Sequence, residues 1–361
     1  MEPCAVSSYE VPTSMRAAIL TAPGQLLAVR KIGLPPLSTG QVLVKLAYSG
    51  ICRSQLMEIK GLRGEDKYLP HLLGHEGSGI VVAIGPQVSK VRRGDRVVLT
   101  WIKGAGIDCQ GPLYSSESGP INAGAVTTFN EYAIAVENRV AKIPDDLPLD
   151  QAWLYGCAIP TGAGIVINTM RATPQNTIAI FGLGGVGLSA LIAATAIGCR
   201  QIFAIDTEAN KLELALELGA SSVINSREQD PFSTLTQLTQ QRGVDFAVEA
   251  SGSAAVIASA FRSVRVNGGR CVFASHPPAH ERISLDPFDL ICGKKIEGSW
   301  GGEFNPDRDI ALFAELYQRS RVDLSKLRLS FYTLDQINEA LSDLEEKKLT
   351  RAALILDPSL Q

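Results

Sequence analysis

The sequence predicts an α/β protein in which a β-rich part precedes a doubly wound parallel sheet. From about Met15 to Val140, short strand-like runs are broken by Gly and Pro, as in a small barrel or sandwich. From about Asn176, strand-like runs alternate with helical segments, which is the pattern of a parallel sheet with helices on both faces. The length of 361 residues is enough for two domains, each with its own core.

The individual elements follow from these two patterns. The expected strands of the β-rich part read RAAIL, QLLAVRKI, QVLVKLAYSG, GSGIVVAIG, DRVVLT and FNEYAIA. In the second part the strands read TIAIFG, QIFAID, SVIN, VDFAVEA and GRCVFAS, with helices from Val186, over ANKLELALELG up to Gly219, and near FSTLTQLTQQRG. The tail, DQINEALSDLEEKKLTRAALIL, predicts a helix and then a strand that need not belong to the parallel sheet.

One uncharged stretch, residues 177–199, is long enough to cross a membrane. Its glycines cluster between a β-like run and an alanine-rich run. This arrangement favours a buried strand, a tight loop and a buried helix over a membrane span.

The composition excludes several classes of protein. The hydrophobic fraction of 45% and the formal charge of −3 are ordinary for a globular protein and give no reason to expect a nucleic-acid or membrane partner. The seven cysteines are odd in number and irregularly spaced, which fits a reducing compartment better than a disulfide framework. The N-terminal residues lack a basic segment leading into an apolar run, so we expect no secretory signal and a cytoplasmic location.

A glycine-rich loop predicts a dinucleotide site. Gly182, Gly184 and Gly187, with Gly185 and Val186 in the same loop, form GLGGVG directly after a strand and before a helix. The first glycine permits a tight turn, the second lets the backbone approach a pyrophosphate, and the third lets the helix pack on the strand. The helix N-terminus offers free N–H groups to the phosphates. The alternative is a flexible loop that only joins two buried elements.

Asp206 favours the nucleotide interpretation of that loop. It ends the next strand, where its carboxylate can accept hydrogen bonds from the adenosine ribose. A 2′-phosphate about 4 Å away would cost on the order of 4 kcal/mol at an effective dielectric of 20, so NAD is expected rather than NADP. A strand-end aspartate that only caps its own backbone is the alternative.

Three residues could hold a catalytic zinc, which typically has three protein ligands and one open position. Cys52, His75 and Cys157 supply suitable donors. Each also has an ordinary interpretation, the cysteines as small buried apolar residues and the histidine as a hydrogen-bonded turn residue. Their wide separation along the chain leaves both interpretations open.

Several ordered motifs resemble one family. GICRS, GHEGSG, GDRVV, GCAIPTGAG, FGLGGVGLSA and LTRAALIL occur in the order typical of the zinc-dependent medium-chain alcohol dehydrogenases. The resemblance runs from about Met15 to the last residues. It implies a GroES-like β-barrel catalytic domain over residues 1–160 and 304–361, and a Rossmann NAD-binding domain over residues 161–303.

The resemblance also implies roles for the candidate metal residues. Cys52, His75 and Cys157 match the ligands of the family's catalytic zinc, which acts as a Lewis acid on a bound alcohol or carbonyl. Glu76 resembles the acidic residue behind the zinc, which assists ligand exchange. Ser54 resembles the hydroxyl residue that hydrogen-bonds the substrate oxygen and begins the proton path.

The resemblance implies cofactor contacts as well. Arg53 and Arg351 match arginines that contact the pyrophosphate, Lys211 matches a lysine near the adenosine ribose, and Thr161 matches a residue beside the nicotinamide. Composition alone would make the three basic residues solvated surface charges.

The chain departs from the family pattern at two positions that bear on metal binding. Many relatives have four closely spaced cysteines that bind a structural zinc, whereas residues 101–124 contain only Cys109, so we expect one catalytic zinc per chain and no structural zinc. Relatives usually have an aspartate that orients the ligand histidine, and this chain has Gln55. A change of this kind can weaken metal affinity by about 10 to 100-fold.

These observations predict an NAD-dependent, zinc-dependent alcohol dehydrogenase that converts a small-molecule alcohol to an aldehyde or ketone, or the reverse. By family resemblance we expect a homodimer or homotetramer. Two alternatives stay open. One is a zinc-free NAD(P)H-dependent reductase of the same superfamily, and the other is a catalytically idle NAD-binding protein.

Overall fold

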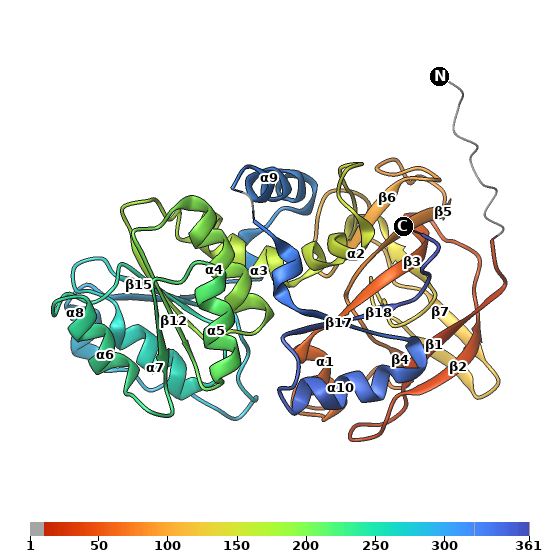
Figure 1. Ribbon diagram of the computed structural model, residues 1–361. Helices are drawn as coiled ribbons and strands as arrows, with labels where there is room; N and C mark the ends of the chain where they lie inside the picture. The colour runs from red at the N-terminus through yellow and green to blue at the C-terminus, as the bar shows by residue number, and fades with distance from the viewer. Residues whose placement is uncertain (1–10, 321, 361) are drawn as a thin grey trace. The chain divides into compact units, whose positions relative to one another are not determined.

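The computed structural model describes residues 11–320 and 322–360. Residues 1–10 lie outside this range. They include Cys4 and part of the N-terminal stretch in which we expect no secretory signal. The chain divides into two compact units: Met1–Cys157, Asn305–Ala311 and Leu329–Gln361 form the first, and Ala158–Phe304 and Leu312–Arg328 form the second. Figure 1 shows both units along the chain.

The first unit contains two β structures. Its closed barrel has five strands, β1 (Ser14–Leu20), β2 (Ala28–Gly33), β7 (Leu113–Ser116), β8 (Gly119–Asn122) and β4 (His71–Leu72). Its seven-stranded sheet runs in the order β10 (Val140–Lys142), β6 (Arg96–Thr100), β5 (Glu76–Ile84), β3 (Gln41–Ile51), β18 (Arg351–Ile355) and β17 (Leu329–Tyr332), with β9 (Tyr132–Val136) also paired to β3.

Strand β3 organises the part of this sheet that carries the candidate site. Its sequence is mostly apolar, and nearly every residue is buried. The strand pairs with β5, β9 and β18. Strand β18 lies antiparallel to β3 with Ala352 opposite Ile51. The tail strand therefore joins the first unit and not the parallel sheet, and it brings Arg351 beside the end of β3.

Three helices accompany the first unit's strands. They are α1 (Arg53–Ile59), α2 (Leu149–Ala152) and α10 (Ile337–Glu345). Ile337 and Leu341 of α10 pack in one apolar cluster with Leu20 of β1 and Ile51 of β3. Short 3-10 helices cover Glu137–Arg139, Trp153–Gly156 and Leu334–Gln336.

The second unit is a six-stranded sheet in which every pair is parallel. The strand order is β13 (Ser222–Asn225), β12 (Gln201–Asp206), β11 (Thr177–Phe181), β14 (Phe246–Glu249), β15 (Arg270–Phe273) and β16 (Lys295–Gly298). The order reverses between β11 and β14, because the chain first builds outward from β11 on one side and then on the other. This reversal is typical of a doubly wound nucleotide-binding sheet.

Helices cover both faces of this sheet (Figure 1). They are α4 (Gly185–Ile197), α5 (Ala209–Glu217), α6 (Pro231–Leu238) and α7 (Ala254–Ser263). The unit also contains α3 (Ala158–Gly164), which packs against α4, and α8 (Pro287–Ile291). Leu235 of α6 and Phe261 of α7 pack against Phe181 and Phe203 of the sheet. Helix α9 (Pro306–Arg319) begins in the first unit and ends in the second, a π-helix covers Ile165–Thr169, and 3-10 helices cover Gly301–Glu303 and Leu324–Leu327.

The predicted fold class is confirmed: a β-rich part with a closed barrel accompanies a doubly wound parallel sheet. Strand β2 begins later than the run QLLAVRKI suggested. Strands β4 and β10 are only two and three residues long, and β16, KIEG, is polar at the edge of its sheet, so none of them carries an apolar pattern in the sequence. The uncharged stretch 177–199 forms β11 and α4, and no helix in the described ranges is long and apolar enough to cross a membrane.

The packing of α7 gives a test of the second unit's core. Phe261 is 0% exposed in the cluster with Phe181 and Phe203, so Phe261→Ala should lower the free energy of unfolding by about 3 to 5 kcal/mol. Phe288→Ala is the matched control, because Phe288 of α8 is 66% exposed and its loss should change that free energy by about 0.5 kcal/mol or less. Denaturant unfolding monitored by circular dichroism measures both, and equal effects would contradict this core assignment.

Candidate metal centre and nucleotide loop

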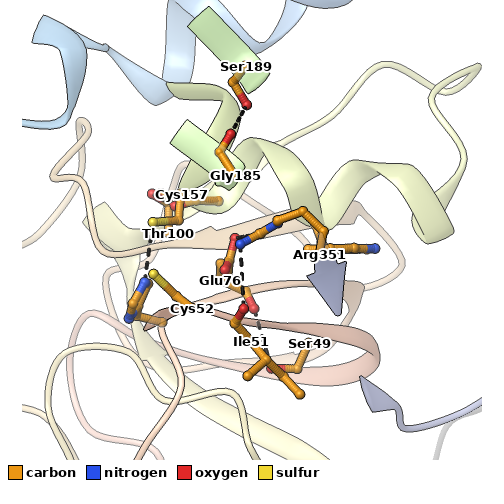
Figure 2. A network of polar contacts seen from close by, with 12 residues as sticks. Ser49, Ile51, Cys52, Glu76, Thr100, Cys157, Gly185, Ser189 and Arg351 are labelled. Atoms are coloured by element: carbon orange, nitrogen blue, oxygen red, sulfur yellow. Dashed lines mark hydrogen bonds and ion pairs between the residues drawn. The ribbon is translucent and has the colours of Figure 1, made fainter. Parts of the chain in front are cut away.

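Four predicted residues meet in the first unit. Cys52, His75, Glu76 and Cys157 each place a potential ligand atom within 4.8 Å of the others. His75 Nε2 lies 3.3 Å from Cys157 Sγ. Figure 2 shows the sulfur atoms of Cys52 and Cys157 turned toward the same space, with the carboxylate of Glu76 beside them.

Different elements supply these side chains. Cys52 is the N-cap of α1 and directly follows β3, and Glu76 is the first residue of β5, directly after His75. Cys157 lies between the 3-10 helix Trp153–Gly156 and α3. The structure therefore gathers residues that the sequence separates by up to about a hundred positions.

Two glycines leave the space that this cluster of side chains requires. Gly74 has a φ of 86°, and a Cβ there would lie 2.4 Å from Thr128 Oγ1, so the turn that presents His75 requires glycine. A Cβ at Gly50 would lie 2.6 Å from both the Glu76 carboxyl carbon and the Trp153 ring. The glycine in β3 thus leaves room for the buried carboxylate.

Glu76 is held by an arginine from the tail of the sequence. Arg351 Nη2 donates to Glu76 Oε2 at 2.7 Å, and the two side chains are 6% and 0% exposed. The guanidinium also lies 4.9 Å from the centre of the Trp153 ring. Figure 2 shows this pair next to the two cysteines. Arg351 was predicted to contact the cofactor pyrophosphate, and that contact stays a prediction, whereas its pairing with Glu76 and its packing on Trp153 had no signal in the sequence.

The electrostatics of the cluster suit a cation. A hydrogen bond from the Cys157 thiol holds the pKa of Cys52 well below its ordinary value, and the same contact raises the pKa of Cys157 well above its own. Burial raises the pKa of Glu76, although Arg351 opposes this change. Glu76 Oε1 is buried and, among the described residues, has no hydrogen-bond partner. Two sulfurs, an imidazole and a carboxylate oxygen with a free lone pair are donors that zinc accepts.

Helix α1 places two further residues at the cluster. Gln55 is 2% exposed, accepts a hydrogen bond from the Cys52 N–H at 3.1 Å, and contacts His75 Nδ1 through its side-chain nitrogen. Ser54 Oγ is shielded from solvent and has no hydrogen-bond partner in the described part of the chain. Arg53, at the start of the same helix, is exposed.

A second group of potential ligands also lies in the first unit. Glu58, Asp66 and His71 bring ligand atoms within 4.8 Å of one another. His71 Nδ1 lies 2.8 Å from the Leu72 carbonyl and Nε2 lies 2.8 Å from Asp66 Oδ2, so both ring nitrogens face oxygen acceptors. Both ring nitrogens are therefore engaged by oxygen atoms of the protein, which leaves neither of them free to bind a metal.

The glycine loop in the second unit has the geometry of an anion-binding turn. Gly182 has a φ of 88°, and helix α4 begins at Gly185 with no side-chain cap, so its first N–H groups are free. A Cβ at Gly184 would meet nothing within 4 Å, whereas a Cβ at Gly187 would lie 1.8 Å from the Gly182 carbonyl oxygen. Gly187 is thus required by the fold, and Gly184 leaves an open approach to the loop.

Asp206 caps backbone groups, as the second interpretation of this residue had it, and its contact with a ribose stays a prediction. Its carboxylate accepts hydrogen bonds from the backbone N–H groups of Leu183 at 2.6 Å, Thr207 at 2.7 Å and Glu208 at 3.0 Å. It therefore fixes the glycine loop to the end of β12, next to the position expected for a ribose. Lys211 lies in α5 just after it, and Thr161 is buried within α3 of the same unit.

Comparisons with known proteins identify the family of this chain. A model described as alcohol dehydrogenase GroES-like domain matches residues 38–145, and one described as zinc-binding dehydrogenase matches residues 185–318. The chain is 30% identical to alcohol dehydrogenase class-2 isozyme 2 of Oryctolagus cuniculus, over 94% of this chain and 97% of that protein. It is also 30% identical to an S-(hydroxymethyl)glutathione dehydrogenase of Photobacterium damsela subsp. piscicida, over 94% and 99%.

Solved structures of alcohol dehydrogenases are also similar to this chain over almost its whole length. The benzyl alcohol dehydrogenase of Acinetobacter calcoaceticus matches with a TM-score of 0.85 at 31% identity, covering 95% of this chain and 99% of that one. An alcohol dehydrogenase zinc-binding domain protein of Burkholderia ambifaria matches with a TM-score of 0.88 at 31% identity and the same coverage. The chain belongs to the zinc-dependent medium-chain alcohol dehydrogenase family, and its homologues are oxidoreductases.

The two loop glycines give a paired test. Gly187→Ala forces a methyl group into the Gly182 carbonyl, so it should lower the free energy of unfolding by about 1 to 3 kcal/mol. Gly184→Ala should leave that free energy within about 0.5 kcal/mol of the wild type, but should weaken NADH binding because the methyl group occupies the open side of the loop. Thermal unfolding and fluorescence titration with NADH distinguish the two, and full NADH affinity in Gly184→Ala would contradict a pyrophosphate at this position.

Proposed function

We propose that this chain is an NAD-dependent, zinc-dependent alcohol dehydrogenase that acts on a small-molecule alcohol or its carbonyl product. The observation that carries the proposal is the convergence of Cys52, His75, Glu76 and Cys157, whose potential ligand atoms all lie within 4.8 Å of one another. The family membership supplies the reaction class. We further propose that residues 1–160 and 304–361 form the catalytic domain and residues 161–303 the NAD-binding domain of a cytoplasmic homodimer or homotetramer.

The chain's residues fit both cofactors. Cys52, His75 and Cys157 would hold one zinc. Glu76 Oε1, which has no hydrogen-bond partner among residues 11–320 and 322–360, is close enough to take part in ligand exchange. The N–H groups at the start of α4 and the open side at Gly184 would hold the pyrophosphate of NAD. A bound zinc supplies a Lewis acid that favours the alkoxide of an alcohol or polarises a carbonyl, and NAD supplies the hydride acceptor.

The protein's own groups would position the substrate and its proton. Ser54 Oγ has no partner within the described residues, so its hydroxyl is free to accept the alcohol proton and to donate to the substrate oxygen in the reverse direction. Arg351 pairs with Glu76 and opposes the rise in the pKa of Glu76 that burial causes, which favours a negative charge next to the two sulfurs. We propose in addition that Arg53 and Arg351 contact the pyrophosphate, Lys211 the ribose and Thr161 the nicotinamide.

Zinc content tests the metal part of the proposal. Protein purified in zinc-supplemented buffer should contain about one zinc per chain by elemental analysis, because one cluster has the donor set of a catalytic site. Cys52→Ser should lose the metal, and Cys109→Ser should keep it, because Cys109 is a free cysteine outside the cluster.

A chain that takes up no zinc in either the wild type or Gln55→Glu, even with zinc in excess, would reject the proposal in favour of one of the two alternatives. Reduction of quinones or activated double bonds by NADPH would then indicate a zinc-free reductase. NADH binding without activity on either substrate class would indicate an idle NAD-binding protein.

Substitution of Asp206 tests the proposed preference for NADH over NADPH. Its carboxylate should repel a 2′-phosphate, so the wild type should bind NADH more tightly than NADPH by about tenfold or more, equivalent to about 1.4 kcal/mol or more. Asp206→Gly should reduce this ratio. Loss of the bonds to Leu183 and Thr207 also loosens the loop, but that effect weakens both cofactors alike, so the ratio isolates the charge. An unchanged ratio of the two dissociation constants would contradict the proposed role.

A further inference from the structure

The orientation of the Gln55 side-chain amide is fixed by a backbone group. Gln55 occupies the third position of α1, and its Oε1 accepts the N–H of the N-cap residue Cys52 at 3.1 Å. A backbone N–H can only donate, so the amide oxygen must face Cys52. The side-chain NH₂ then faces His75 Nδ1, which it contacts.

This orientation determines which nitrogen of His75 carries the proton. An NH₂ group can only donate, so His75 Nδ1 must accept and must present a lone pair. In a neutral imidazole the single proton is then on Nε2. Nε2 is the nitrogen that faces the cluster, 3.3 Å from Cys157 Sγ, and a metal can bind it only when it carries no proton.

We propose that Gln55 selects the Nε2–H tautomer of His75 and thereby opposes metal loading, so that it acts as a positioning residue that keeps zinc affinity low. This inference rests on the proposed function, because it takes the cluster to be a zinc site. Zinc binding at Nε2 moves the proton to Nδ1, which then needs an acceptor. The Gln55 amide supplies one only by turning over, which sets its NH₂ against the Cys52 N–H. A carboxylate at the same position accepts from both groups and removes the conflict.

Burial prevents solvent from relieving this conflict. Gln55 is 2% exposed and its amide lies between two fixed partners, so water does not replace a lost hydrogen bond without a change in packing. The conflict therefore reduces zinc affinity instead of being absorbed by hydration.

Zinc affinity in Gln55→Glu gives the first test. Glutamate has the length of glutamine and two accepting oxygens, so competition with a chromogenic chelator should show zinc binding about 10 to 100-fold tighter than in the wild type. Arg53→Gln is the matched control. Arg53 lies in the same first turn of α1, so this substitution changes the net charge by the same amount without altering the contact between Gln55 and His75. It should change zinc affinity by less than about threefold. Equal tightening in both variants would show that charge alone is responsible and would overturn the proposal.

The tautomer of His75 in metal-free protein gives the second test and needs no metal. The chain has four histidines, so imidazole ¹⁵N resonances are few, and the spectrum of His75→Gln assigns the ring in question. The wild type should show His75 protonated at Nε2, and Gln55→Glu should show it protonated at Nδ1. Protonation at Nδ1 in the wild type would overturn the proposal even if Gln55→Glu fails to fold.

The two tests separate this proposal from the proposed function. If neither the wild type nor Gln55→Glu binds zinc, the zinc-dependent function fails, and with it the effect of Gln55 on metal loading. If both bind zinc with the same affinity, the proposed function stands and the role of Gln55 is wrong.

Discussion

The buried ion pair between Glu76 and Arg351 is the interaction on which the first unit's site depends. Two charges are taken out of water, which is costly, and the cost is offset only because the groups hydrogen-bond at 2.7 Å and the guanidinium packs on Trp153. Glu76 begins β5 and Arg351 begins β18, the two strands on either side of β3. The pair therefore fixes the sheet at the point where β3 ends and Cys52 follows. Loss of either partner leaves an uncompensated buried charge, worth about 3 to 5 kcal/mol.

The individual candidate residues could be found in the sequence more readily than their contacts. Cys52, His75 and Cys157 have the right chemistry, but their spacing has no metal signature, and only the ordered motifs around them favoured a ligand set. The pairing of Glu76 with Arg351 could not be predicted, because it depends on the register of β3 against β18. The contact from Gln55 to His75 was out of reach for a similar reason, since it depends on the backbone geometry at the start of α1.

The second unit was the more predictable of the two. Each strand and helix there is local in sequence, and the alternating pattern gives the sheet type directly. The exceptions are informative. Strand β16 has no apolar signal because it lies at a sheet edge, and the bonds from Leu183, Thr207 and Glu208 to Asp206 depend on how the glycine loop turns back toward β12. Asp206 therefore supports the loop whether or not a ribose is bound, and its conformation is set before any cofactor arrives.

The placement of β18 has a consequence for biosynthesis. During translation the ribosome releases the whole of the second unit before β17 and β18 emerge, so the parallel sheet can fold while the first unit still lacks two strands of its own sheet. Glu76 and its partner are 275 residues apart, and until Arg351 arrives the carboxylate has no counter-charge to permit its burial. The unit that begins first along the chain is therefore completed last. The cluster of Cys52, His75, Glu76 and Cys157 acquires the Arg351 partner of its carboxylate only after the parallel sheet has been synthesised.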